Sequence, residues 1–386
     1  MACVSEILVV CPQPRDERLA RSERFRVRLA GPDLDAAPVD TRALLDELAE
    51  LPADGVVGTK DRSALLAAQL AERRGLPGPS PGAIVSCQHK PTSRAIQQRV
   101  APEATPRFAL ADGPPPFPPP WWAKPVVGRL SQEARRVDTE AELAGLVDDS
   151  TYRQRYADLA GLPWDAVSGF LVEELVAGDE VTLEGFVHEG DVTVIGVTDS
   201  VKYPGTNSFE RFEYPSALPA TRLVELEGLA AALVPAHGLD ACFFNIEFFV
   251  PGDGAAQIVE LNPRLASQFS PLVQAVHGRS TYDALFALAC GEDPCWDGGA
   301  PSGVAISYVV RVFDDALVEA VPEPQDGLEI LVYPGLMLSE QGTNDTASYR
   351  LAIFTEWGET RAAALQRCRQ RARSLRFQLD GAGRSR

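Results

Sequence analysis

Two acidic side chains and an amide stand in segments where a globular protein usually places apolar residues. Glu247 interrupts the apolar run CFFNIEFFV (242–250), and Glu260 and Asn262 belong to a second run, AQIVELN (256–262). The turn signal PGDG separates the two runs, which predicts a β-hairpin. Burial of an unpaired carboxylate is costly, so each acid needs a salt bridge or a metal ion as compensation.

The spacing of these residues is compatible with a divalent metal site. Glu260 and Asn262 are two residues apart on one predicted strand, so their side chains point to the same face. A hairpin can bring Glu247 onto that face as well. Carboxylate and amide oxygens are ligands that Mg²⁺ prefers, with waters and substrate phosphates in its other positions. The segment alone is equally compatible with two salt-bridged or solvated glutamates on a strand face.

Two lysines add a possible anion site. Lys124 lies in the apolar strand-like run WWAKPV, and the following loop VVGRLSQ contains Gly128 and Ser131. A lysine at the end of a strand can reach a phosphate while N–H groups of the next turn cradle it. The alternative is a surface lysine lying along apolar neighbours. Lys90 precedes a helix predicted to begin two or three residues later, which is also a suitable position for binding an anion.

The segment FLVEELVAGDEVTLEG reads as a strand, a short turn and a second strand. Such a connector can present Glu173 and the backbone of Leu175 and Val176 to the edge of a purine. Glu180 then lies within reach of ribose hydroxyls. The alternative is an ordinary hairpin with a charged face toward solvent.

The elements around these residues predict an α/β protein. Strand-like and helix-like runs alternate in the first 85 residues, which predicts a small parallel sheet flanked by helices. From about residue 121 the chain is rich in strands. The segment 200–215 is predicted to be a long loop. Its Lys202 and Arg211 are candidate contacts for a substrate carboxylate, and the alternative is that they are solvated loop charges. The tail DGAGRSR is predicted to be disordered.

Composition excludes several classes of protein. The chain has 386 residues, enough for two or three domains, with 36 Lys and Arg against 54 Asp and Glu and a net charge of −18. This balance argues against nucleic acid or an anionic membrane as the main partner. No signal sequence and no apolar run near 18 residues is found, and seven cysteines without CxxC pairs fit a reducing cytoplasm.

Taken together, the motifs resemble the ATP-grasp superfamily. The shared pattern is a lysine, KP with a Gly-containing loop, VEELVAGDE, and Glu, thirteen residues to Glu, two to Asn, then NPR. The resemblance covers roughly residues 85–290 and implies a small N-terminal parallel α/β domain followed by a two-lobed ATP-grasp domain. The segments it implies are 1–85, 86–165 for the small lobe, 166–300 for the large lobe with the nucleotide and metal site, and 301–386 completing that lobe.

Carried over by position, the resemblance implies a role for each site residue. The nucleotide residues would be Lys90 and Lys124 at the phosphates, the loop Gly128–Ser131 over them, Glu173, Leu175 and Val176 at adenine, and Glu180 at the ribose. The metal ligands would be Glu247, Glu260 and Asn262. Arg264 would steady the transferred phosphoryl group or the substrate carboxylate that receives it, and Lys124 would be the second catalytic residue. The loop departs from the family pattern because it has one glycine and a bulky Arg129.

The implied activity is that of an ATP-dependent ligase with ATP and Mg²⁺ (or Mn²⁺) as cofactors. It would join a small-molecule carboxylate to an amine, most simply two amino acids, through an acyl phosphate, and a homodimer is possible by resemblance. One alternative is a biotin-type carboxylase component that activates bicarbonate. With only Met1 and Met337, the chain has no MKM-type biotin-carrier segment, so that activity would need a separate carrier. Another alternative is an ATP-binding regulator without turnover.

Overall fold

The computed structural model describes residues 4–36, 38–129, 133–148, 151–297, 299, 301–341, 344–345 and 348–380. The chain divides into two compact units. The first consists of Met1–Gly196, Leu218–Ser267 and Ser280–Asp297, and the second of Val197–Ala217, Gln268–Arg279 and Gly298–Arg386. No helix among the described residues has both the length and the apolar character needed to cross a membrane. The four-segment division predicted from the sequence stays a prediction.

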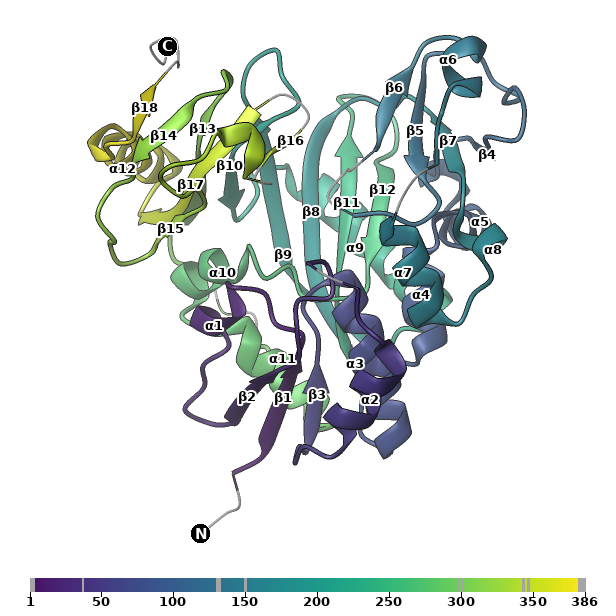
Figure 1. Cartoon of the computed structure of the whole chain (residues 1–386), viewed down its shortest axis with the longest axis horizontal. Coiled ribbons are helices and arrows are strands. Elements are labelled where there is room, and N and C mark those ends of the chain that lie inside the picture. Colours follow the sequence, from purple (N-terminus) through teal and green to yellow (C-terminus); the bar gives the residue numbers. More distant parts are fainter. Residues whose placement is uncertain are drawn as a thin grey trace. The chain divides into compact units, whose positions relative to one another are not determined.

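The first unit begins with a three-stranded parallel sheet in the order β2-β1-β3 (Figure 1). Its elements are β1 (Glu6–Val10), α1 (Asp16–Leu19), β2 (Arg26–Ala30), α2 (Thr41–Ala49), β3 (Gly55–Val57) and α3 (Asp61–Arg74). The side chain of Asp40 accepts hydrogen bonds from the first N–H groups of α2, and Gly75, with φ of 65°, ends α3. The predicted small parallel sheet with flanking helices is confirmed.

A second, four-stranded antiparallel sheet follows in the order β4-β7-β5-β6. Its strands are β4 (Phe108–Leu110), β5 (Trp121–Pro125), β6 (Arg135–Val137) and β7 (Phe170–Glu174). The neighbouring helices are α4 (Pro81–Gln88), α5 (Lys90–Val100), η1 (Pro102–Ala104), α6 (Glu140–Ala144), α7 (Thr151–Ala160) and α8 (Trp164–Val167). The prediction that Lys90 lies before its helix is wrong. Lys90 is the first residue of α5, because the ring of His89 caps the helix by accepting from the N–H of Thr92.

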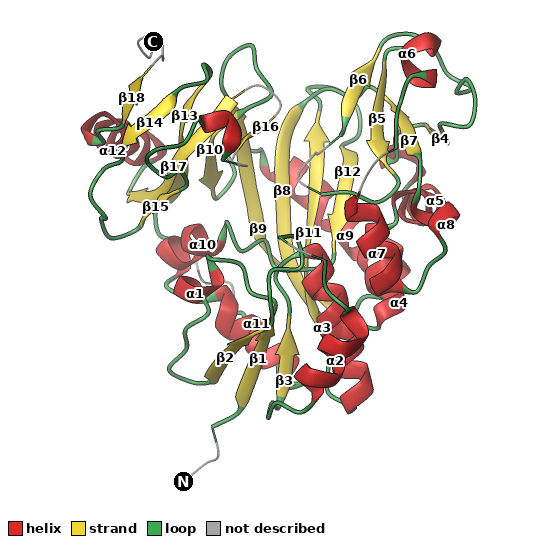
Figure 2. Ribbon diagram, viewed as in Figure 1, coloured by secondary structure: helices red, strands yellow, loops and turns green. Residues whose placement is uncertain are grey.

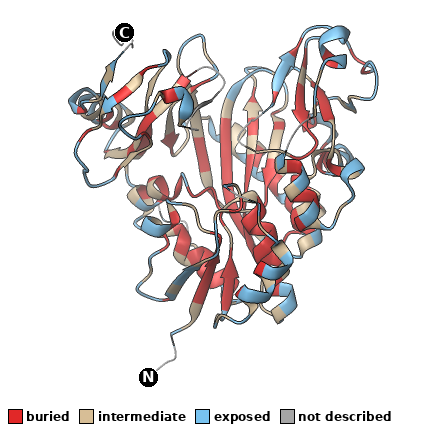
Figure 3. Cartoon of the chain, viewed as in Figure 1, coloured by how far each residue is buried: buried red, intermediate tan, exposed pale blue. Residues whose placement is uncertain are grey.

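A third group of strands in the first unit contains the predicted hairpin. These strands lie beside one another in the order β12-β11-β8-β9 (Figure 2). These elements are β8 (Asp179–His188), β9 (Asp191–Lys202, in the first unit up to Gly196), α9 (Ala220–Ala236), β11 (Cys242–Val250), β12 (Gln257–Asn262) and α11 (Thr281–Ala289). Antiparallel pairing of β11 with β12 confirms the hairpin. Buried residues predominate along β8 and β11 (Figure 3), and Phe243, Phe244 and Ile246 are fully buried.

The second unit contains antiparallel strands in the order β9-β10-β13-β17-β15. Its elements after β9 are β10 (Phe209–Tyr214), α10 (Ser270–His277), β13 (Val304–Val312), β14 (Leu317–Ala320), β15 (Leu328–Ile330), η2 (Leu338–Glu340), β16 (Asn344–Asp345), β17 (Ser348–Gly358), α12 (Arg361–Ser374) and β18 (Gln378–Asp380). The loop predicted over 200–215 is wrong. Residues 209–214 form β10, because the aromatic and charged residues of FERFEY can pair between β9 and β13. The predicted disordered tail lies outside the described residues from residue 381 onward.

Candidate functional site

Three neighbouring strands of the first unit carry two rows of polar side chains. The cross-strand partners are Thr182, Glu247 and Glu260 in one row and Glu184, Asn245 and Asn262 in the other. Residues two apart on a strand point to the same face, so both rows occupy one face of β8, β11 and β12. The predicted pairing that brings Glu247 beside Glu260 is therefore confirmed. The role of these residues as metal ligands stays a prediction.

The two glutamates of the first row are unequally compensated. Burial, followed by the charges of Glu260 and Glu180, raises the pKa of Glu247 to about 8. Burial also opposes ionisation of Glu260, but the charge of Lys90 and of other nearby cations holds the pKa of Glu260 below its ordinary value. Lys90 Nζ lies 3.1 Å from Glu260 Oε1. One acid of the pair thus has a cation beside it, and the other is held against a like charge.

The donor set of this face fits a divalent cation. Besides the carboxylates it offers an amide oxygen, because the Asn262 side chain donates through Nδ2 to Asn245 Oδ1, 3.1 Å away, and its own Oδ1 has no partner among the described residues. Within those residues no group of three or more His, Cys, Asp or Glu side chains could hold a metal. A cation on this face would therefore take its remaining ligands from waters and phosphates, as Mg²⁺ commonly does.

Arg264 is held in place by an acid from the N-terminal sheet region. Its Nε lies 2.5 Å from Oδ1 of Asp61, the first residue of α3. Burial opposes the charge of Arg264, but Asp61 and then Glu260 and Glu247 raise its pKa overall. Asp61 is itself fixed, because Gln88 donates to its backbone carbonyl over 2.7 Å. The sequence analysis named Arg264 but missed Asp61, which lies 203 positions earlier and carries no local signal.

Lys124 lies in a buried ion-pair cluster with Glu173 and Arg94. Glu173 Oε1 lies 2.6 Å from Arg94 Nε, and Glu173 Oε2 lies 2.7 Å from Lys124 Nζ. Burial lowers the pKa of Lys124 to about 8 against the attraction of Glu173. Burial opposes ionisation of Glu173, but Arg94 and Lys124 keep the pKa of Glu173 below its ordinary value. Both oxygens of Glu173 are thus occupied by cations, and its predicted contact with adenine stays a prediction.

Arg94 was also missed from the sequence, although a signal for it exists. It follows Lys90 by four residues on α5, so the two side chains share one face of the helix. Arg94 Nη2 and Lys124 Nζ both donate to the carbonyl oxygen of Val259, at 2.9 and 3.1 Å. The cluster therefore joins α5, β5 and β7 to the strand that carries Glu260.

The predicted adenine and ribose residues lie at the connection between β7 and β8. Leu175 is 42% exposed, Val176 is partly buried, and Glu180 lies on β8 opposite Phe249. Gly178 has φ of 152°, and a Cβ at this position would lie 2.6 Å from the carbonyl carbon of Val250. Only glycine allows this close approach, so the connector is fixed against the end of β11.

The loop after β5 is partly described. Gly128 and Arg129 lie in the structure, whereas Ser131 lies outside the described residues. Arg129 forms an ion pair with Asp35 of the N-terminal region, and its guanidinium lies 5.2 Å from the ring centroid of Tyr152. The bulky side chain that departs from the family pattern is thus engaged with the N-terminal sheet region.

The two candidate substrate residues, Lys202 and Arg211, belong to the second unit. Arg211 forms ion pairs with Glu210 and, over 2.5 Å, with Glu213. Lys202 Nζ lies 5.5 Å from the ring centroid of Phe209. Their role toward a substrate stays a prediction.

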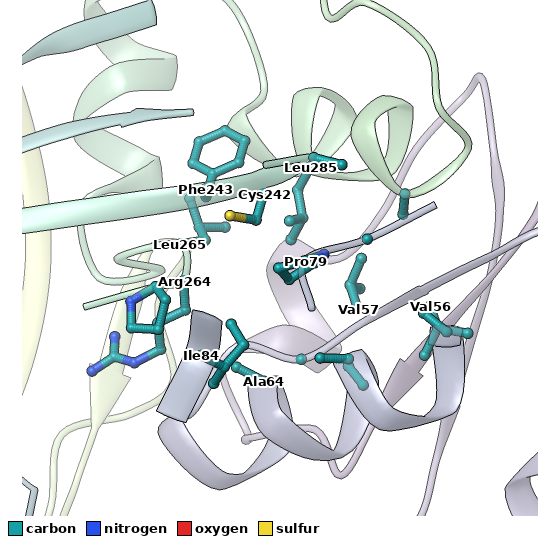
Figure 4. Close-up of a pocket in the computed structure, with 18 of the residues that line it drawn as sticks. Val56, Val57, Ala64, Pro79, Ile84, Cys242, Phe243, Arg264, Leu265 and Leu285 are labelled. Carbon is teal, nitrogen blue, oxygen red and sulfur yellow. The ribbon is translucent and has the colours of Figure 1, made fainter. Parts of the chain in front are cut away.

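A small cavity lies behind Arg264 (Figure 4). Its volume of about 40 Å³ is enclosed mainly by apolar side chains, among them Val57, Ile84, Phe243 and Leu285. This volume holds a water molecule or two at most and no nucleotide or amino acid. Residues of α3 and β11 are among those that line it.

Comparison with known proteins places this arrangement in a class. Residues 117–271 match the model of a protein family described as ATP-grasp domain. The curated proteins compared with the chain gave no significant match. The matched span includes Lys124, Glu173, Glu247, Glu260 and Arg264. The predicted resemblance to the ATP-grasp superfamily is therefore confirmed over residues 117–271.

Solved structures share the fold over nearly the whole chain. The L-amino acid ligase of Bacillus licheniformis is 18% identical with a TM-score of 0.74, covering 97% of this chain and 98% of that one. The phosphoribosylglycinamide synthetase of Anaerococcus prevotii is 14% identical, with a TM-score of 0.66 and coverage of 97% and 100%. The biotin carboxylase domain dimer of the Hydrogenobacter thermophilus 2-oxoglutarate carboxylase, in complex with MgADP, ADP and bicarbonate, is 14% identical, with a TM-score of 0.72 and coverage of 98% and 91%. The predicted fold class is confirmed.

Proposed function

We propose that this protein is an ATP-dependent, ADP-forming ligase that joins a small-molecule carboxylate to an amine through an acyl phosphate. The observation that carries the proposal is the face on which Glu247, Glu260 and Asn262 converge, with Lys90 and Arg264 at its border. An under-compensated acid pair bordered by cations is poorly suited to stabilising a fold and well suited to binding a metal–phosphate complex.

In this proposal the chain binds ATP with Mg²⁺ or Mn²⁺. Glu247, Glu260 and Asn262 would hold the metal, which when bound offsets negative charge on the phosphates. The nucleotide residues proposed are Lys90, Lys124, Gly128 and Ser131 at the phosphates, Glu173, Leu175 and Val176 at adenine, and Glu180 at the ribose. Support comes from the ATP-grasp family match and from the structurally similar carboxylase domain that binds MgADP.

The protein's own contribution to the reaction is charge screening and orientation. The carboxylate substrate and the γ-phosphate are both anions and repel each other, so cations must lie between them. Arg264 is suited to this task because Asp61 fixes its Nε and leaves the other guanidinium nitrogens for anions. Holding the two reactants together provides most of the remaining acceleration, and no protein nucleophile is needed.

Amino acids are the substrates that the comparisons favour, because a structurally similar protein is an L-amino acid ligase. Lys202 and Arg211 remain candidates for contacting the substrate carboxylate. A second candidate function, activation of bicarbonate, is favoured by the similar carboxylase domain that binds it. That domain is a dimer, which supports a homodimer as part of the proposal. The free cysteines suit the reducing cytoplasm.

Phosphate release from ATP and Mg²⁺ with pools of amino acids tests the proposal. The wild type is compared with Glu260→Gln and with a matched control, Glu174→Gln, which alters an acid on β7 that pairs with Arg107. We expect release that depends on a pool, is lost in Glu260→Gln and is retained in the control, and mass spectrometry then identifies the product. Release with bicarbonate alone would support the second candidate. Tight ATP binding without release in any condition would contradict both and indicate a regulator.

A further inference from the structure

Asn245 is a buried side chain beside the proposed metal ligands whose amide is engaged on both sides. It is 3% exposed and lies on β11 opposite Asn262 of β12 and Glu184 of β8. Its Oδ1 accepts from Asn262 Nδ2 over 3.1 Å. Its Nδ2 donates to the backbone carbonyl of Arg264 over 2.9 Å. A buried amide held at both ends has one orientation.

That orientation follows from donor and acceptor chemistry alone. A backbone carbonyl only accepts, so the atom of Asn245 that faces Arg264 must be its NH₂ group. The carbonyl oxygen of Asn245 must then face Asn262, and the atom of Asn262 that meets it must be an NH₂ group. The oxygen of Asn262 is therefore the atom left over. The carbonyl of Arg264 thus determines, through two amides, which atom Asn262 offers to the face with Glu247 and Glu260.

The row formed by Glu184, Asn245 and Asn262 also holds the segment that carries Arg264. Glu184 Oε1 accepts from the backbone N–H of Ala266 over 2.7 Å, and Asn245 bonds the carbonyl of Arg264 two residues earlier. The backbone on both sides of Leu265 is therefore fixed to β8 and β11. Arg264 itself is fixed at its guanidinium by Asp61.

We propose that Asn245 is a positioning residue that turns the side-chain oxygen of Asn262 toward the metal and fixes the backbone of Arg264. The inference rests on the proposed function, because it assumes that a metal–nucleotide complex binds this face. With an amide oxygen presented, Asn262 is a hard ligand that suits Mg²⁺; with the amide reversed it would present an NH₂ group, which cannot coordinate a cation. Loss of a residue that orients a metal ligand commonly weakens metal binding by about 10–100-fold.

The test measures how much Mg²⁺ strengthens binding of a non-hydrolysable ATP analogue. Calorimetry gives the Kd of the analogue with Mg²⁺ and with EDTA, and the ratio of the two values isolates the contribution of the metal. The variants are Asn245→Leu and Asn245→Ala, which remove both hydrogen bonds, and Asn245→Asp, which keeps an acceptor for Asn262. Ile246→Val, on the opposite face of the same strand and fully buried, is the control for loss of packing.

We expect the metal-dependent ratio to fall by about tenfold or more in Asn245→Leu and Asn245→Ala, with the Kd in EDTA unchanged. The ratio should be retained in Asn245→Asp and Ile246→Val. If one of the first two variants fails to fold, the other carries the same test. If Asn245 had only a packing role, the loss of the metal-dependent ratio across the four variants would instead follow the loss of melting temperature. That result would overturn the proposal.

The two levels of inference fail in distinguishable ways. If Mg²⁺ does not strengthen binding even in the wild type, the metal assignment of the proposed function is wrong. If Mg²⁺ acts in the wild type and Glu260→Gln loses the effect while both Asn245→Leu and Asn245→Ala keep it, only the role of Asn245 is wrong.

Discussion

Two groups of charges in the first unit are built on opposite principles. In one, Glu173 is enclosed by Arg94 and Lys124, with every oxygen of the acid paired. In the other, Glu247 and Glu260 face each other across β11 and β12, with one lysine at hydrogen-bonding distance from Glu260. Val259, which accepts from both cations of the first group, directly precedes Glu260. The first group is therefore hydrogen-bonded to the strand that carries Glu260, and the two groups differ in compensation.

The pKa directions express this difference. Although burial opposes both charges, the pKa of Glu173 is lowered by its two cations, whereas the pKa of Glu247 is raised to about 8 by burial and by the charge of Glu260. A paired buried acid stabilises one arrangement of the chain, and its loss is costly mainly when a partner is left alone. An acid pair without enough cations keeps a proton on one of its members at neutral pH, and a bound cation can take the place of that proton. The comparison thus separates a supporting cluster from a binding site.

Removal of a cation from the ion-pair cluster of Arg94, Lys124 and Glu173 should give the largest loss of stability. Arg94→Met leaves Glu173 buried with Lys124 alone, and the free energy of unfolding is expected to fall by about 3–5 kcal/mol. Urea denaturation measures the loss. Arg94→Lys keeps the charge but not the paired geometry and should fall between Arg94→Met and the wild type. Equal stability of Arg94→Met and the wild type would show that the cluster does not support the fold.

Release of Arg264 from its partner should reduce turnover more than binding. In Asp61→Ala the guanidinium loses its fixed position, and the turnover number is expected to fall by about 10–100-fold because a small misplacement is enough. The Kd of an ATP analogue should change little. Asp46→Ala, which alters an exposed acid of α2, serves as the control. Parallel changes in turnover and Kd would instead assign Arg264 to nucleotide binding.

Lys124 belongs to the ion-pair cluster with Glu173 but is also proposed to contact the phosphates. A variant of Lys124 therefore tests whether one residue can serve both groups. Lys124→Ala should weaken analogue binding in EDTA by about tenfold, the value of one charged hydrogen bond. The pKa of Lys124 is about 8. The amine is charged below that value and neutral above it, so the wild-type affinity should fall as the pH rises through 8. The affinity of the variant should lack this component, and identical pH profiles would exclude Lys124 from the phosphate site.

The smallest effect is expected at the connector between β7 and β8. Leu175 is 42% exposed and is proposed to contact adenine through its backbone. Leu175→Ala should therefore change analogue binding by no more than about 0.5 kcal/mol, as exposed substitutions usually do. Calorimetry measures it beside Lys124→Ala. A tenfold loss would show that the side chain itself covers the base.

The sequence predicted what depends on local pattern. Alternation and the PGDG turn were enough to pair β11 with β12 and so to place Glu247 beside Glu260. The start of α5 was placed too late because a histidine cap is uncommon, and β10 was taken for a loop because its FERFEY run is short and largely charged. The first error concerns a local cap, and the second concerns a strand whose structure is decided by its neighbours in space.

The partners of the site residues could not be predicted in the same way. Asp61 and Arg264 are 203 positions apart, and Arg94 and Glu173 are 79 apart. No periodicity links residues at such distances, and only the folded chain brings them together. Glu173 shows the consequence: its motif position suggested adenine, whereas its contacts are the two cations. The site residues themselves could thus be named from the sequence. The ion-pair partners that hold them in place could not.

The central claim is that the acid pair is left under-compensated for a metal–nucleotide complex. The most direct measurement is the melting temperature of the wild type and of Glu247→Gln, each with and without Mg²⁺ and a non-hydrolysable ATP analogue. Because burial and the charge of Glu260 raise the pKa of Glu247 to about 8, its carboxyl is largely neutral at neutral pH without a cation, and Glu247→Gln keeps a neutral side chain there. The account therefore predicts an equal or higher melting temperature without ligand and loss of the Mg²⁺-dependent increase that the wild type shows. A lower melting temperature without ligand, together with an increase like that of the wild type, would contradict it.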